Sequence, residues 1–117
     1  MNVIVDTGPL VALLNRRDAH HRWAKNVLAE IAPPLRTCEA VLSEACFLVR
    51  HLDGGPAAVL DIVARGVVEI AFRLEDEVAA VSKLMTRYAS VPMALADACL
   101  VRMTELTNRC KIWTVDR

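Results

Sequence analysis

Short runs of β-branched and other apolar residues alternate along the chain with longer segments whose apolar residues recur at helical spacing. The short runs predict strands at residues 2–5, 35–37, 67–70 and 111–115. The longer segments predict helices at about residues 7–15, 19–31, 39–51, 57–65, 75–88 and 93–107. Because one or two helices separate successive strands, the pattern predicts right-handed crossovers and an α/β fold, in which helices cover both faces of a short parallel sheet.

Residues with known preferences for helix ends support these boundaries. Thr7 is the predicted cap of the first helix, and Pro9 falls in its first turn, where a missing N–H does no harm. Asp18 is the predicted cap of the second helix. Gly66 is well suited to follow the fourth helix, since glycine readily adopts the left-handed conformation found there.

The totals describe one domain, residues 1–117, that is long enough to bury a hydrophobic core. Hydrophobic residues make up 55% of the chain and the mean hydropathy is +0.34, yet charges interrupt every apolar run before it reaches the length of a bilayer span. No signal peptide precedes the first strand, so we expect a cytoplasmic protein. Fourteen basic and fourteen acidic residues cancel, and global charge therefore predicts neither nucleic-acid nor membrane binding.

The cysteines and the aromatic residues both predict packing rather than chemistry. The cysteines form no CxxC pair and show no zinc-finger spacing, so we expect reduced thiols packed as small apolar groups at Cys38, Cys46, Cys99 and Cys110. The larger aromatic residues lie at apolar positions and predict core packing for Trp23, Phe47, Phe72 and Trp113. A base-stacking platform would need exposed aromatic rings in series, and the sequence indicates none.

Four acidic residues stand in unusual positions. Asp6 and Asp116 follow predicted strands directly, and ligands of parallel sheets bind at the carboxyl ends of strands. Glu44 shares a predicted helix face with Val41 and Leu48, and Asp97 lies among apolar residues at helical spacing, so periodicity turns both acids inward. For any one of them, a buried acid that pairs with Arg or caps a helix is an equally good interpretation.

Taken together, the four acids favour a metal site. Carboxylates that converge on one pocket repel each other unless cations neutralise them, and oxygen ligands without His or Cys favour Mg²⁺ or Mn²⁺. A pair of such ions is a common apparatus for in-line attack on a phosphodiester.

Four motifs in order along the chain resemble the PIN-domain family, and in particular the VapC toxins of bacterial and archaeal toxin–antitoxin pairs. They are Val5-Asp6-Thr7-Gly8-Pro9, Ser43-Glu44-Ala45, Leu95-Ala96-Asp97-Ala98 and Thr114-Val115-Asp116-Arg117. The resemblance spans the whole chain and implies a flavodoxin-like sheet. It also implies Mg²⁺- or Mn²⁺-dependent endoribonuclease activity on tRNA or rRNA through a metal-activated water. The implied partners are a cognate antitoxin and a second copy of the chain in a homodimer.

Residue by residue, the resemblance implies catalytic, metal-binding roles for Asp6, Glu44, Asp97 and Asp116. It implies supporting hydroxyls at Thr7, Ser43 and Thr114. Relatives continue past the last motif into a final strand, whereas this sequence ends at Arg117, so the last edge strand of the sheet is an open question. RNA phosphates would attract arginine side chains, and the candidates are Arg16, Arg17, Arg50 and Arg102. Each of them is explained more simply as an ordinary surface residue.

Three other interpretations remain beside the toxin. A PIN-type RNA-processing nuclease would share the chemistry without the toxin role, and a degenerate PIN-like binding module would share only the fold. An aspartate-nucleophile phosphatase would use Asp6, but such enzymes place a second Asp two residues later, where this chain has Gly8.

Overall fold

The computed structural model describes residues 1–87, 90–91 and 93–115. Within them, a parallel sheet contains the strands β1 (Asn2–Val5), β2 (Leu35–Thr37), β3 (Val68–Ile70) and β4 (Cys110–Trp113). The strand order is β3-β2-β1-β4, so the first strand of the chain lies at the centre, beside the last one. Ile4 pairs with Arg36 of β2, and Val5 pairs with Trp113 of β4. The predicted α/β class, the parallel sheet and the four strand positions are confirmed.

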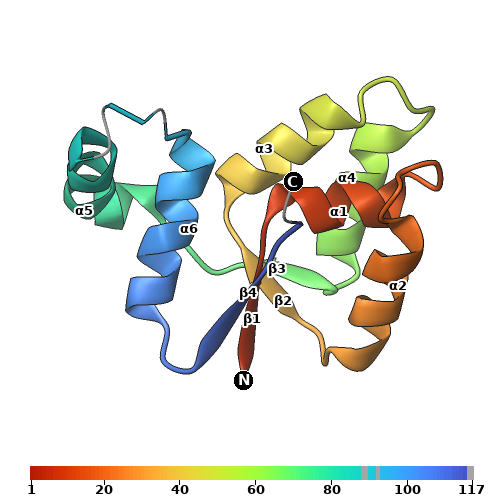
Figure 1. Ribbon diagram of the computed structural model, residues 1–117, viewed down its shortest axis with the longest axis horizontal. Helices are drawn as coiled ribbons and strands as arrows, with labels where there is room; N and C mark the ends of the chain where they lie inside the picture. The colour runs from red at the N-terminus through yellow and green to blue at the C-terminus, as the bar shows by residue number, and fades with distance from the viewer. Residues whose placement is uncertain (88–89, 92, 116–117) are drawn as a thin grey trace.

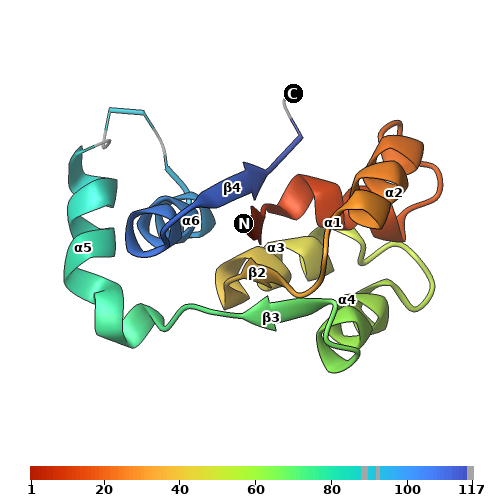
Figure 2. The same ribbon diagram turned by 90° about the horizontal axis from the view of Figure 1, so that it is seen from below.

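Helices cover both faces of this sheet, as Figure 2 shows from below. The described helices are α1 (Thr7–Leu14), α2 (His21–Glu30), α3 (Glu39–Leu48), α4 (Gly55–Ala64), α5 (Leu74–Arg87) and α6 (Leu95–Leu106). On one side lie α1, α2 and α4, and on the other lie α5 and α6. Helix α3 lies over the carboxyl edge of the sheet, where it contacts α1, α4 and α6 (Figure 1).

Two helix starts differ from the prediction. The cap of α1 is Asp6 rather than Thr7, because the Asp6 side chain accepts a hydrogen bond of 2.7 Å from the Thr7 N–H. The second helix begins at His21, later than predicted. Asp18 instead holds the preceding turn, where its side chain accepts from the His20 N–H at 2.8 Å and its carbonyl accepts from the His21 N–H at 3.0 Å.

The core lies around the central strand. Ile4 and Val5 are fully buried, together with Leu10 of α1 and Leu35 of β2. Buried Thr37 donates its hydroxyl to the Val5 carbonyl at 3.0 Å, so this polar group is satisfied without water.

Two of the four aromatic predictions for the core are wrong. Trp113 and Phe72 are buried, but Trp23 is 41% exposed and Phe47 is 59% exposed. Trp23 of α2 packs edgewise on Trp113 with ring centroids 6.0 Å apart. The partly exposed Trp23 ring therefore covers the buried Trp113 ring. Phe47 lies near the end of α3, beyond the cover of the sheet, so its helical spacing from apolar neighbours does not bury it.

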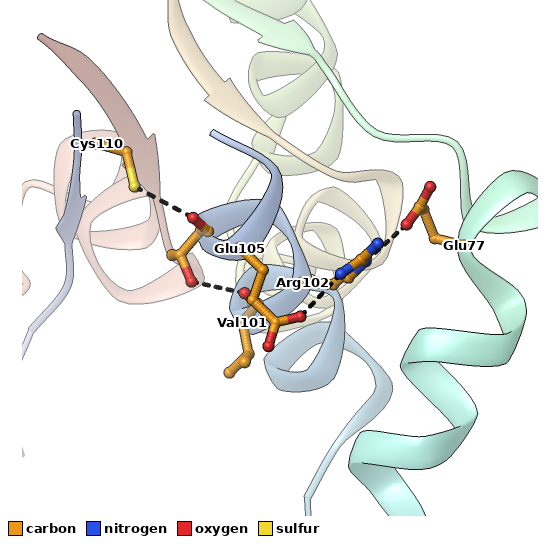
Figure 3. A network of polar contacts seen from close by, with 6 residues as sticks. Glu77, Val101, Arg102, Glu105 and Cys110 are labelled. Carbon is orange, nitrogen blue, oxygen red and sulfur yellow. Dashed lines mark hydrogen bonds and ion pairs between the residues drawn. The ribbon is translucent and has the colours of Figure 1, made fainter. Parts of the chain in front are cut away.

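A partly buried ion pair joins α5 to α6 on the other side of the sheet (Figure 3). Arg102 donates to Glu77 of α5 at 2.6 Å and to Glu105 of its own helix at 3.1 Å. Near this ion pair, the Cys110 thiol donates to the Thr104 carbonyl at 3.8 Å, which ties β4 to the end of α6. Because two carboxylates engage Arg102, it serves the packing of the helices.

Among the described residues, no helix has the length and apolarity needed to cross a membrane.

Candidate active site at the carboxyl edge of the sheet

Asp6 lies at the point where the central strand passes into α1. Its backbone N–H still bonds to the Trp113 carbonyl at 3.0 Å, so the main chain stays in the sheet while the side chain caps the helix. The residue is half-buried. Its negative charge lies against the positive end of the α1 dipole, which offsets part of the cost of placing a carboxylate here.

Threonine hydroxyls connect Asp6 to its surroundings. The Thr114 hydroxyl, just beyond β4, donates to Asp6 Oδ2 at 2.9 Å, while Asp6 Oδ1 accepts from the Thr7 N–H. The buried Thr7 in turn donates its hydroxyl to Glu44 Oε2 of α3 at 3.3 Å. These contacts join β1, α1, α3 and the segment after β4 in one cluster, with Asp6 and Glu44 linked through Thr7.

Gly8 makes the contact between Thr114 and Asp6 possible. A Cβ atom at Gly8 would lie 3.1 Å from Val115 Cβ and 3.2 Å from Val115 Cγ2, closer than ordinary van der Waals contact. The absence of a side chain therefore allows residues 114–115 to pass across the first turn of α1. Sequence reasoning missed this role, and the available signal was a glycine inside the first turn of a helix, where it has low intrinsic propensity.

Asp97 enters the same region from α6. It lies in the first turn of that helix, where its carboxylate accepts from the Ala94 N–H at 3.3 Å. Two residues later, the Cys99 thiol contacts the Cys38 thiol, which also feels the charge of Asp6. Figure 1 shows the first turns of α1, α3 and α6 at the same edge of the sheet, so Asp97 belongs to the edge that carries Asp6.

The prediction that Glu44 and Asp97 point inward is wrong, since both residues are exposed. The helices α3 and α6 begin at the open edge of the sheet, where solvent reaches even side chains that share a face with core residues. Ser43 is exposed on α3. Asp116, with Arg117, lies outside the described residues, so its predicted position at the site stays a prediction.

The described residues provide a partial set of oxygen ligands for a metal. Among them, no three His, Cys, Asp or Glu side chains lie close enough together to hold an ion, so Asp97 does not complete a three-ligand group with Asp6 and Glu44. The donor chemistry nevertheless fits Mg²⁺ or Mn²⁺. Such ions commonly take one or two protein carboxylates and fill their remaining positions with water and substrate phosphate oxygens.

The thiols at this edge have a packing role. Burial, the largest cause, raises the pKa of Cys38 above its ordinary value, and burial together with the neighbouring Cys38 raises the pKa of Cys99 to about 11. Both thiols therefore stay protonated at neutral pH and are poor ligands and poor nucleophiles. All four cysteines of the chain are described and free of disulfides, in agreement with the predicted reduced state.

Comparison with known proteins gives the family of this fold. A family model described as the PIN domain matches residues 3–117. The chain belongs to the PIN-domain family. This PIN domain is 27% identical over 117 residues to Ribonuclease VapC26 of Mycobacterium tuberculosis, with 98% of this chain and 87% of that protein covered.

A solved structure agrees with the PIN fold. The crystal structure of Mycobacterium tuberculosis VapC20, which is described as a Sarcin-Ricin loop cleaving toxin, superposes with a TM-score of 0.80 at 24% sequence identity. The match covers 98% of this chain and 92% of that one. The two chains thus share the whole PIN architecture.

Proposed function

We propose that this PIN domain is a metal-dependent endoribonuclease and the toxin of a VapBC-like toxin–antitoxin module. The observation that carries the proposal is the pair of carboxylates at the open carboxyl edge, Asp6 and Glu44, which Thr7 links, with exposed Asp97 in the first turn of a neighbouring helix. The similarity to a protein named as a ribonuclease supports the same chemistry.

In this proposal the carboxylates bind Mg²⁺ or Mn²⁺. Asp6 and Glu44 would hold the ion directly, Asp97 is a further acid at this edge, and the predicted fourth acid, Asp116, lies outside the described residues. A bound divalent ion supplies a water of lowered pKa and positive charge opposite the phosphate oxygens, as in other metal-dependent hydrolases of phosphodiesters.

The chain's own contribution is orientation. Thr114 and the Thr7 N–H each donate to a different oxygen of Asp6, which fixes the plane of that carboxylate and the direction of its remaining lone pairs. Thr7 does the same for one oxygen of Glu44 and leaves the other oxygen of that carboxylate available to a ligand.

The proposed substrate is structured RNA of the tRNA or rRNA class, and the proposed partners are an antitoxin and a second copy of the chain. An apolar groove of about 430 Å³ between α1, α2, α4 and the sheet supports an antitoxin-binding surface. It is lined by apolar residues such as Leu13 and Ile62 and also by the exposed cations Arg16 and Lys25. Those cations complement a partner segment that carries both apolar and acidic side chains.

A short DNA-binding-protein gene directly upstream would support the toxin role over an RNA-processing role.

Substitution of the acids tests the enzyme. We expect Asp6→Asn and Asp97→Asn to lower Mn²⁺-dependent cleavage of total RNA by at least about 100-fold, because each removes a negative charge from the edge where the metal is proposed to bind. Asn caps a helix about as well as Asp, so Asp6→Asn should leave α1 intact. The measurement is the rate of cleavage, with mapped fragment ends to identify the target.

Asp53→Asn is the matched control, because it removes an exposed acid from the loop between α3 and α4 without touching the carboxyl edge. It should cleave RNA like the unaltered protein. Full activity in both Asp6→Asn and Asp97→Asn would contradict the nuclease assignment.

A further inference from the structure

An exposed aromatic ring and a guanidinium form a stacked pair at the end of α3. Phe47 is 59% exposed, which is unusual for a ring of its size in a chain with a well-filled core. The Arg50 Cζ atom lies 3.8 Å from the centroid of that ring. The Arg50 Nη1 group also donates to the Phe47 carbonyl at 2.7 Å, so the guanidinium is fixed over the ring.

The hydrogen bond explains the position of Arg50 but not the exposure of Phe47. A cation that binds a carbonyl in the last turn of a helix is a common way to satisfy a helix C-terminus. The ring, however, has one face covered by the guanidinium and keeps most of its surface open to solvent. Within the part of the chain that the structure describes, Arg50 is in no ion pair with a carboxylate, so its positive charge remains available.

The pair lies next to the proposed metal site. Phe47 follows Glu44 by three residues on α3, which places it on the neighbouring position of the same helix face, about 4.5 Å further along the axis. Ser43, Glu44 and Phe47 are all exposed, whereas Val41 and Ala45 of the same helix face the core. The exposed side of α3 and the turn after it therefore present, in order, a carboxylate of the site, an open ring and a cation.

We propose that Phe47, stacked on Arg50, is a platform for one unpaired base of the RNA next to the cleaved phosphodiester; a single base needs only this one ring, whereas a series of rings would hold several bases. The inference rests on the proposed nuclease function. Single-stranded segments of RNA are recognised by bases stacked on aromatic rings and on guanidinium planes, and a neighbouring cation also attracts the phosphates. Phe47 and Arg50 are positioning residues in this arrangement, since they hold a nucleotide beside the reacting group.

An RNA occupant fits this surface better than a protein. Phe47 lies about one helical turn from Glu44 on α3, so the nucleotide next to a phosphate at Glu44 is within reach of the ring. The fixed guanidinium also places positive charge beside an otherwise acidic site, where a polyanion needs it.

Replacement of the ring by an apolar side chain without a π face tests the proposal. The parent protein for this test is the full chain with Asp6→Asn, which should bind RNA without cleaving it. It is titrated in Mg²⁺ buffer against a fluorescein-labelled single-stranded RNA, and fluorescence anisotropy gives the Kd for RNA. We expect Phe47→Leu to weaken binding by about 5- to 150-fold, the range for loss of one stacked base. We expect Phe47→Trp to bind within about 2-fold of the parent, because tryptophan also stacks.

Leu60→Ala is the matched control. Leu60 is 62% exposed on α4, an apolar side chain as open as Phe47 but away from the site, and its loss should leave Kd unchanged. In the active protein, Phe47→Leu should raise KM for RNA by a similar factor while Mn²⁺ affinity stays constant, a split that a folding defect would not produce.

The possible results separate the two proposals. RNA affinity and KM unchanged in Phe47→Leu would overturn the stacking platform, even where the unaltered protein cleaves RNA. A dimer that dissociates in light scattering on Phe47→Leu, with RNA affinity unchanged, would show a protein interface and would overturn it as well. An unaltered protein that neither binds nor cleaves RNA would overturn the nuclease function and the platform together.

Discussion

At the scale of single residues, Asp6 has two tasks that depend on the same atoms. One carboxylate oxygen caps α1, and the other accepts from Thr114, beyond the last strand. The hydrogen bonds hold the carboxylate in one orientation before any ligand arrives. Fixed ligands bind metals more strongly than mobile ones because less orientation is lost on binding, so the threonine contacts should influence metal affinity.

Thr114→Val is the test of that orientation. Valine has nearly the shape of threonine but no hydroxyl, so Asp6 loses a hydrogen bond. We expect a loss of about 1 kcal/mol in the free energy of unfolding, from one partly exposed bond to a charged group, and a 10- to 100-fold loss of Mn²⁺ affinity. Urea denaturation measures the first and isothermal calorimetry measures the second.

Thr86→Val provides the comparison, because Thr86 donates to the Ser82 carbonyl on the exposed side of α5, away from the site. Its Mn²⁺ affinity should equal that of the unaltered protein. Equal Mn²⁺ affinity in the Thr114 and Thr86 variants would mean that Thr114 has no influence on a metal at Asp6.

At the scale of elements, the close approach of the chain after β4 to the first turn of α1 depends on Gly8. We expect Gly8→Ala to change overall stability little, because the better helix propensity of alanine, up to about 1 kcal/mol, offsets the contact with Val115. The displaced segment should nevertheless lose the Thr114 contact with Asp6, and the rate of RNA cleavage should fall about 10-fold or more.

The double variant Gly8→Ala/Val115→Gly distinguishes this cause from others. Replacement of Val115 by glycine removes both the Cβ and the Cγ2 atoms that the new Cβ would meet, so activity should return toward that of the Val115→Gly single variant. Activity that stays low in the double variant would show that the glycine acts through something other than this approach.

The helices and strands were predictable from the sequence, because apolar residues recur with a different period in helices than in strands. The strands are also short and rich in β-branched residues. Exposure was less predictable. Glu44 and Phe47 have helical spacing from core residues, but α3 lies over an edge of the sheet, where one layer of cover is missing. Periodicity describes the faces of a helix and cannot say how far a neighbouring layer extends.

Contacts across the chain were beyond sequence reasoning for a related reason. The four acids could be selected by residue type and motif, and their strands and helices could be placed in order. The hydrogen bond from Thr114 to Asp6 joins residues 108 positions apart, and its existence depends on the path that Gly8 permits. Such a path is a property of the packed structure rather than of a local pattern.

At the scale of the whole molecule, metal binding and folding should be coupled, because the proposed ligands come from segments that join only in the folded chain. Mn²⁺ at about 100 times its Kd should stabilise the protein by about 2.7 kcal/mol and raise Tm by roughly 10 °C. Thermal denaturation with and without Mn²⁺ measures this shift.

The Asp6→Asn variant should show no rise in Tm on addition of Mn²⁺, while the Asp53→Asn variant should show the same rise as the unaltered protein. No rise in Tm at millimolar Mn²⁺ in the unaltered protein would instead support a degenerate PIN-like binding module, which keeps the fold without a functional metal site.

The pairing of the first strand with the last one also has a consequence during synthesis. The central strand β1 emerges from the ribosome early, yet its neighbour β4 and the Thr114 hydroxyl emerge more than a hundred residues later. A nascent chain that lacks this segment has an incomplete sheet and an unsupported Asp6. For a protein whose proposed activity would destroy the RNA of its own translation machinery, this topology delays assembly of the active site until β4 and Thr114 have been synthesised.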